Sequence, residues 1–113
     1  MADRGDVFQL KRRLGFGAEQ EAERVVIVQA SPLNSVLPTM IAVPLEPLVD
    51  TFAGSPLAVT VSAQEAGATD DHVAIASWLH VVRSDRLAPG RVGKLLPRTM
   101  GELGDKLRLV LDL

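Results

Sequence analysis

The middle of the chain, from Val25 to Val82, contains no lysine or arginine and only five acidic residues. All lysine and arginine side chains lie in the two ends, residues 1–24 and 83–113. Hydrophobic residues make up 47% of the chain, so a middle without basic groups is typical of an apolar sheet core. The net charge of −2 gives weak bulk attraction to nucleic acid, although the two ends can still present a local basic patch.

The length and composition favour one small cytoplasmic domain. A chain of 113 residues can build one core, and we expect a single domain over residues 1–113. No apolar run is long enough to cross a membrane, and we expect no secretory signal. The absence of cysteine excludes disulfides, thiolate zinc sites and cysteine nucleophiles, and it fits a cytoplasmic protein.

Short apolar segments predict about six strands in meander order. The clearest covers residues 24–30, where four consecutive β-branched side chains are stiff and leave both faces apolar, as in a central strand. Pro44 and Pro47 place the end of the strand over residues 39–45 at a sheet edge or bulge. The other expected strands cover residues 7–10, 57–62, 72–76 and 91–95. Residues 64–71 read as a polar loop, and residues 78–87 as a turn of irregular helix.

One helix is predicted at the C-terminus, over Pro97–Leu113. Met100, Leu103 and Leu107 are spaced by three and four residues and form one apolar stripe. Pro97 suits the first turn of a helix. Strands in the middle and a helix at the end predict a mainly β protein, a strongly curved antiparallel sheet or open barrel capped by a helix.

The residues alone point only weakly to chemistry. His72 and His80 could act as an acid–base pair, but one begins a predicted strand and the other sits between Leu79 and Val81, so a structural reading is better. Asp70-Asp71-His72 is the one metal candidate and reads better as a solvated loop. Arg24 and Thr39 each begin a predicted strand, and we expect a turn to bring them to one rim of the sheet. A guanidinium grips a phosphate in two places and a hydroxyl can donate to it, so the pair can stabilise a phosphodiester under attack. The alternative is an edge arginine paired with Glu21 or Glu23 and a threonine in a turn.

Several short motifs follow one another along nearly the whole chain. They are Arg4-Gly5-Asp6-Val7, Glu19-Gln20, the Val25–Gln29 strand, Thr39, Pro97-x-x-Met100 and the closing Leu109-Val110-Leu111-Asp112-Leu113. In this order the sequence resembles the MazF/PemK toxins of bacterial type II toxin–antitoxin systems. The resemblance implies an SH3-like open barrel of curved antiparallel strands with a C-terminal helix (CcdB/MazF-like), acting as a homodimer.

The resemblance also implies an activity. It points to a sequence-specific, metal-independent endoribonuclease that cleaves single-stranded RNA without a cofactor, gives a 2′,3′-cyclic phosphate and a 5′-OH, and is inhibited by a cognate antitoxin. The family's essential arginine opens the second strand, and we assign it to Arg24 because no other basic residue lies between positions 14 and 82. The family's Ser/Thr is assigned to Thr39, which stands ten residues after Gln29.

The resemblance further suggests where RNA binds. Relatives cover the RNA groove with the loop that Arg4 and the Lys11-Arg12-Arg13 cluster flank here; these cations either position phosphates or are solvated loop charges. The RNA-binding candidates are Arg4, Lys11, Arg12, Arg13, Gln20 and Gln29.

Trp78 departs from many relatives, which carry an acid followed by Gln at the positions of Ser77-Trp78. It either fills a dimer or antitoxin interface, which we favour, or stacks on a base.

Two other functions stay open. One is a catalytically decayed homologue that still binds antitoxin, and the other is a CcdB-like toxin that binds DNA gyrase. The CcdB-type helix ends in Trp-Gly-Ile, so the ending Leu111-Asp112-Leu113 argues against gyrase.

Overall fold

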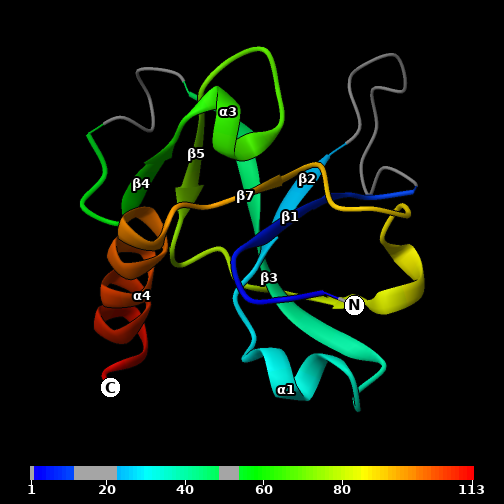
Figure 1. The fold of residues 1–113 in the computed structure, drawn as a ribbon. Helices are drawn as coiled ribbons and strands as arrows, with labels where there is room; N and C mark the ends of the chain where they lie inside the picture. Colours follow the sequence, from blue (N-terminus) through cyan, green and yellow to red (C-terminus); the bar gives the residue numbers. More distant parts are fainter. Residues whose placement is uncertain (1, 12–22, 49–53) are drawn as a thin grey trace.

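The computed structural model describes residues 2–11, 23–48 and 54–113. In these residues seven strands form one curled antiparallel sheet, and a C-terminal helix packs beside its β4 edge (Figure 1). The strands are β1 (Asp6–Gln9), β2 (Arg24–Ile27), β3 (Thr39–Pro47), β4 (Ala58–Val61), β5 (His72–Ile75), β6 (His80–Arg83) and β7 (Gly93–Lys94). The helices are α1 (Ser31–Asn34), α3 (Ala63–Ala66), the 3-10 helix η1 (Ser84–Arg86) and α4 (Pro97–Leu111). None of these described helices is long and apolar enough to cross a membrane. The expected mainly β fold with a C-terminal helix is confirmed.

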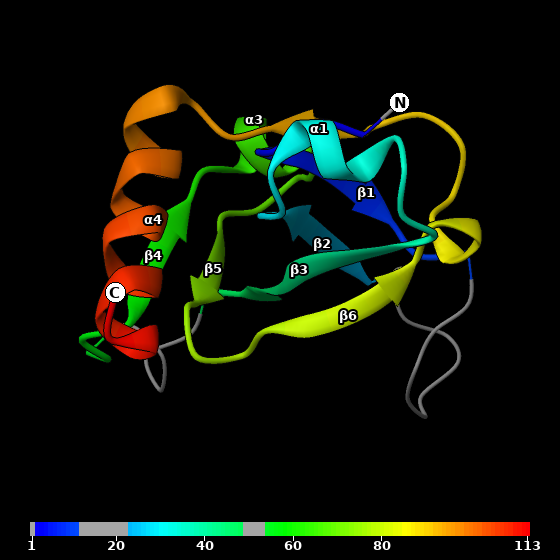
Figure 2. The same ribbon diagram turned by 90° about the horizontal axis from the view of Figure 1, so that it is seen from below.

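The long strand β3 organises the sheet. The strand order is β4-β5-β3-β2-β1-β7, with β6 pairing β3 beside β5, so the sheet is not the simple meander expected (Figure 2). Residues 39–42 of β3 pair with β6, and residues 45–47 pair with β5. Pro44 falls in the gap between these two partners, where its missing N–H removes no bond to either of them. Of the expected sheet edge or bulge, the sheet edge is wrong for Pro44, because β3 has β2 on one side and β6 and β5 on the other. Pro47 is the last residue of β3 and pairs with His72 of β5.

Two apolar cores lie on the two faces of β2. Val26 belongs to the first core with Val43, and α4 closes this core with Leu103. Val25 and Ile27 belong to the second core. All four residues of β2 are buried, which confirms the prediction of a central strand that is apolar on both faces.

The irregular helical turn expected over residues 78–87 is found only at Ser84–Arg86, as the 3-10 helix η1, and the residues before it form strand β6. Val82 packs in the second core and is 6% exposed, whereas Val81 points outward and is 71% exposed. This alternation fits a strand with one buried face. Pairing with residues 39–42 of β3 stabilises the strand, and such a distant partner is not visible in the local sequence.

The expected polar loop over residues 64–71 contains the short helix α3. Ser62 accepts a hydrogen bond from the Glu65 N–H, and the Glu65 carboxylate in turn accepts from the Ser62 N–H, which makes a capping box. The helix ends at Gly67, whose φ of +66° is a left-handed conformation that favours glycine. The Ser-x-x-Glu spacing was therefore a usable helix signal.

Helix α3 packs directly on β7 through two glycines. A Cβ on Gly67 would lie 2.0 Å from the Val92 carbonyl oxygen, and one on Gly93 would lie 2.0 Å from the Glu65 carbonyl oxygen. No side chain larger than hydrogen fits at either position without a shift of the backbone. This contact fixes the position of the Gly67 carbonyl, which faces the first residue of β2.

Candidate functional site

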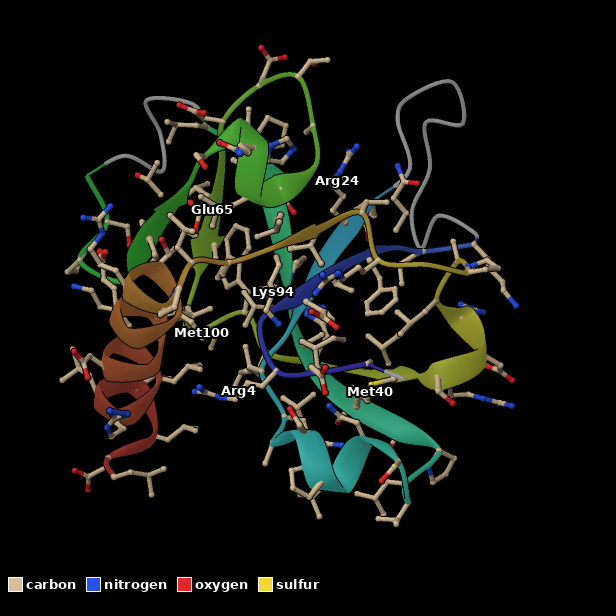
Figure 3. The ribbon with its side chains drawn as sticks, in the orientation of Figure 1. Arg4, Arg24, Met40, Glu65, Lys94 and Met100 are labelled. Carbon is tan, nitrogen blue, oxygen red and sulfur yellow. The ribbon has the colours of Figure 1, made fainter. Side chains whose placement is uncertain are left out.

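Arg24 begins β2 at one end of the sheet. It lies between Gln9 of β1 and Leu45 of β3, its cross-strand neighbours, and it is only 9% exposed. Its Nη2 donates a hydrogen bond to the Gly67 carbonyl oxygen at 3.1 Å. Figure 3 shows the side chain at the end of β2, beside the segment that follows α3. The permanent charge of Arg24 is thus held in a defined place by the sheet and by the C-terminus of α3.

Thr39 lies at the opposite end of the β2–β3 pair. The partner of Arg24 on β3 is Leu45, six residues beyond Thr39, or about 20 Å at 3.3 Å per residue. The partner of Thr39 is Arg83 of β6. The expectation that Arg24 and Thr39 share one rim is therefore wrong, because the first residues of two consecutive antiparallel strands lie at opposite ends of the pair.

Gln29 is part of an internal network at the corner between β2 and α1. Its Nε2 donates to Asn34 Oδ1 at 2.8 Å and to the Thr39 carbonyl oxygen at 3.1 Å. The Asn34 amide donates in turn to the Ala2 carbonyl oxygen at 3.0 Å. Both N–H groups of the Gln29 side chain are therefore used inside the protein. Gln29 therefore has no side-chain N–H left to donate to RNA, and its contact with RNA stays a prediction.

Of the other expected RNA-binding residues that the structure describes, Lys11 lies two residues beyond Gln9, the cross-strand neighbour of Arg24, whereas Arg4 lies near the other end of β2. Arg4 is exposed, and its Nε donates to the Val28 carbonyl oxygen at 3.1 Å. Its guanidinium reaches Gly104 of α4, where a Cβ would lie 3.4 Å from it. Lys11 is exposed, and its backbone N–H donates to the Arg86 carbonyl oxygen. Arg12, Arg13 and Gln20 lie outside the described residues.

Two basic residues near the C-terminal helix neutralise a buried acid. Asp6 is 2% exposed, and its carboxylate accepts hydrogen bonds from Arg91 and Lys94, each at 3.1 Å, and from the Asp3 N–H at 2.9 Å. Burial alone would raise the pKa of Asp6, but these hydrogen bonds outweigh burial and lower it. Arg91 and Lys94 therefore hold β7 on β1 through a buried carboxylate.

A pocket of about 240 Å³ lies at the same end of the β2–β3 pair as Arg24, on the face that carries the second core. Its lining residues are Glu23, Val25, Pro44, Glu46, Trp78, His80 and Val82. Glu23 precedes Arg24, and Glu46 follows Leu45, the partner of Arg24. Because side chains alternate along a strand, Arg24 points to the opposite face of the sheet, toward Gly67, and does not line the pocket. Sequence reasoning missed this group, because its members come from three segments whose register only the folded sheet reveals.

One carboxyl group of the pocket, that of Glu46, has a shifted pKa. The pKa of Glu46 is raised above its ordinary value, first because the carboxyl is partly buried and second because the Glu23 carboxylate lies nearby; the charge of His72 offsets this only in part. The Nδ1 atom of His80 lies 3.0 Å from the Trp78 carbonyl oxygen. Since a carbonyl only accepts, the hydrogen of this bond sits on Nδ1. In the part of the chain described, no group of three or more acidic or histidine side chains is arranged to hold a metal ion.

The comparison with protein families decides what kind of chain this is. The profile of the PemK-like, MazF-like toxins of type II toxin–antitoxin systems matches residues 3–111. The chain belongs to this family. No curated protein matches the sequence significantly. As a MazF-like toxin, the chain has the fold that its sequence resemblance implied.

Solved structures show the same MazF-like fold. An endoribonuclease in complex with its cognate antitoxin, from a Mycobacterial species, superimposes with a TM-score of 0.79 and 23% identity, covering 100% of this chain and 97% of that one. MazF from Deinococcus radiodurans gives 0.74 and 22%, covering 98% and 96%. Mycobacterium tuberculosis toxin MazF-mt6 gives 0.76 and 18%, covering 96% and 97%.

Proposed function

We propose that this protein is an endoribonuclease toxin that cleaves single-stranded RNA and is neutralised by a cognate antitoxin. Family membership over residues 3–111 supports the toxin assignment, and the endoribonuclease–antitoxin complex among its structural neighbours supports the activity and the partner. The observation that carries the proposal is the placement of Arg24, a buried cation held at the end of β2 by the Gly67 carbonyl.

Arg24 stabilises the charge that develops on the phosphate. When the ribose 2′-OH attacks the adjacent phosphorus, the bond to the 5′-oxygen of the next nucleotide breaks. The products are a 2′,3′-cyclic phosphate and a 5′-OH. The phosphoryl oxygens gain negative charge on the way, and a guanidinium already in place lowers the barrier because it needs no reorganisation. Thr39 has no part in this step, since it lies at the other end of the sheet.

We further propose that the toxin acts as a homodimer in the cytoplasm, needs no metal ion or cofactor, and cleaves at a particular RNA sequence. Solved MazE–MazF complexes from Deinococcus radiodurans show that neighbours of this fold assemble with an antitoxin. The antitoxin proposed here is the product of a gene expressed together with the toxin. Light scattering of the purified toxin tests the dimer directly.

The activity is tested with purified protein, a long single-stranded RNA and EDTA in excess. We expect a limited set of cuts on primer extension, and fragments that end in a cyclic phosphate by mass spectrometry. Cuts that require added Mg²⁺, or fragments ending in a 5′-phosphate, would contradict the proposed chemistry. Intact RNA together with tight binding of the antitoxin would identify the protein as a decayed homologue instead.

A further inference from the structure

Two acidic side chains lie opposite each other in the pocket on the second-core face of the sheet. The register that pairs Arg24 with Leu45 puts the next residues of the two strands opposite each other. These residues are Glu23 and Glu46, and both line the pocket. Like charges directly opposite each other destabilise a sheet. Partial burial and then the Glu23 carboxylate raise the pKa of Glu46, so a positive charge bound between the two carboxylates would relieve a real repulsion.

The described part of the chain supplies little positive charge to this pair. None of the described residues that line the pocket is a lysine or an arginine, and no ion pair among the described residues involves Glu23 or Glu46. His80 lines the pocket, but its Nδ1 already donates to the Trp78 carbonyl oxygen. His72 of β5 offsets the raised pKa of Glu46 only in part. The pocket is therefore an acidic site that a cation from outside the fold can complete.

The rest of the lining suits a flat cation on an aliphatic stem. Val25, Pro44 and Val82 are apolar, and Trp78 adds an aromatic ring that is 38% exposed. A guanidinium stacks on an indole and presents a fork of N–H donors to carboxylates, while its methylene stem packs on apolar side chains. The volume of about 240 Å³ is below the range of about 300–1,000 Å³ that is usual for drug-sized ligands, as expected for a site that takes one side chain.

We propose that this pocket binds one arginine side chain of the antitoxin, with the guanidinium between the carboxylates of Glu23 and Glu46 and against the ring of Trp78. The inference rests on the proposed function, because that function supplies the antitoxin as the protein partner. The Arg24 side chain points to the other face of the sheet, toward Gly67, so it does not repel a guanidinium bound in the pocket at close range.

Other occupants suit the pocket less well. The two carboxylates repel the phosphate that accompanies every base of RNA. Across the described residues, no group of three or more acidic or histidine side chains is arranged to hold a metal ion. A lysine ammonium ion carries the right charge, but it lacks the flat fork that matches an indole and two carboxylates together.

The first test uses the intrinsic fluorescence of the protein. Trp78 is the only tryptophan and the chain has no tyrosine, so emission excited at 295 nm reports on the indole of this pocket. The purified toxin is titrated with N-acetyl-arginine amide, with the uncharged analogue N-acetyl-citrulline amide, and with GMP. We expect a saturable change with the arginine probe at about tenfold lower concentration than with the citrulline probe. Glu46→Gln is expected to remove this difference, whereas Glu102→Gln, on the exposed surface of α4, is expected to keep it.

The second test measures the affinity of the co-expressed antitoxin by calorimetric titration of the same toxin variants. We expect Glu46→Gln to bind the antitoxin about tenfold more weakly than the parent does, because one of the two charges that hold the guanidinium is gone. Glu102→Gln is expected to bind it as tightly as the parent.

Several results would overturn the proposal. Equal responses to the arginine and citrulline probes would show that the pocket does not select a cation, and a stronger response to GMP than to the arginine probe would assign the pocket to RNA. Unchanged antitoxin affinity in a folded Glu46→Gln variant would exclude the antitoxin arginine as the occupant. Failure of the ribonuclease proposal is distinct, because RNA then stays intact while the arginine probe still binds.

Discussion

The Glu65 carboxylate links the end of β4, helix α3 and the start of α4, and we expect its removal to lower the free energy of unfolding. Its Oε1 accepts from the Ser62 N–H at 3.2 Å and from the Ser62 hydroxyl at 2.9 Å, and its Oε2 accepts from the Leu96 N–H at 2.8 Å. Glu65→Ala leaves two backbone N–H groups near the buried carboxylate without an acceptor, at about 1–3 kcal/mol each. We therefore expect a loss of about 3–5 kcal/mol in the free energy of unfolding. Glu65→Gln keeps one oxygen and should lose about 1–2 kcal/mol.

The measurement is urea unfolding of the parent, both variants and the exposed control Glu102→Gln, with thermal melting alongside. At about 4 °C per kcal/mol for a domain of this size, Glu65→Ala should melt about 12–20 °C lower, and the control should match the parent. Because α3 positions the Gly67 carbonyl that Arg24 contacts, ribonuclease activity should fall with α3 even at temperatures where the sheet remains folded. A Glu65→Ala protein within about 1 kcal/mol of the parent would refute the view that this carboxylate holds α3 and α4 to the sheet.

Two further carboxylates give opposite dependences of stability on pH. The pKa of Asp6 is lower in the folded protein than in the unfolded chain, where it is near 3.9. The ionised carboxylate therefore stabilises the fold above that pH, and this stabilisation is lost as pH falls through the folded pKa. Asp6→Asn should lower the free energy of unfolding by about 1–3 kcal/mol at pH 7, and urea titrations should show this difference shrinking toward pH 3. A deficit that does not depend on pH would contradict the pairing with Arg91 and Lys94. The raised pKa of Glu46 means that its ionised form destabilises the fold, a penalty that is relieved as pH falls. Glu46→Gln should therefore unfold at higher urea than the parent at pH 8 and at the same urea at low pH, and a less stable variant at pH 8 would count against the placement beside Glu23.

The local sequence predicted those elements whose signal is local. The four β-branched residues after Arg24 are apolar toward both faces, and the first three of them do form a central strand. The spacing of Met100 and Leu103 predicted the buried stripe of α4. Strand β6 was missed because Val81 and Val82 are adjacent apolar residues, and only the partner strand β3 makes one of them face the core.

The candidate site was predicted less well, for two different reasons. The separation of Arg24 from Thr39 follows from antiparallel pairing alone, so that error was avoidable. The pocket is different in kind. Glu23 and Glu46 are far apart in sequence, and His80 meets them only because β6 pairs with β3 at Ala42. No local sequence pattern predicts that register between the strands.

The central claim, that the Arg24 guanidinium stabilises the transition state of RNA cleavage, is tested most directly by single-turnover kinetics. Cleavage rate and RNA affinity are measured separately for the parent, Arg24→Ala, Arg24→Lys and the exposed control Arg98→Ala. We expect Arg24→Ala to cut about 10²–10³-fold more slowly while RNA affinity changes much less, Arg24→Lys to recover part of the rate, and Arg98→Ala to match the parent. An Arg24→Ala protein that cuts RNA at the parent's rate, or that loses binding but not rate, would contradict the account.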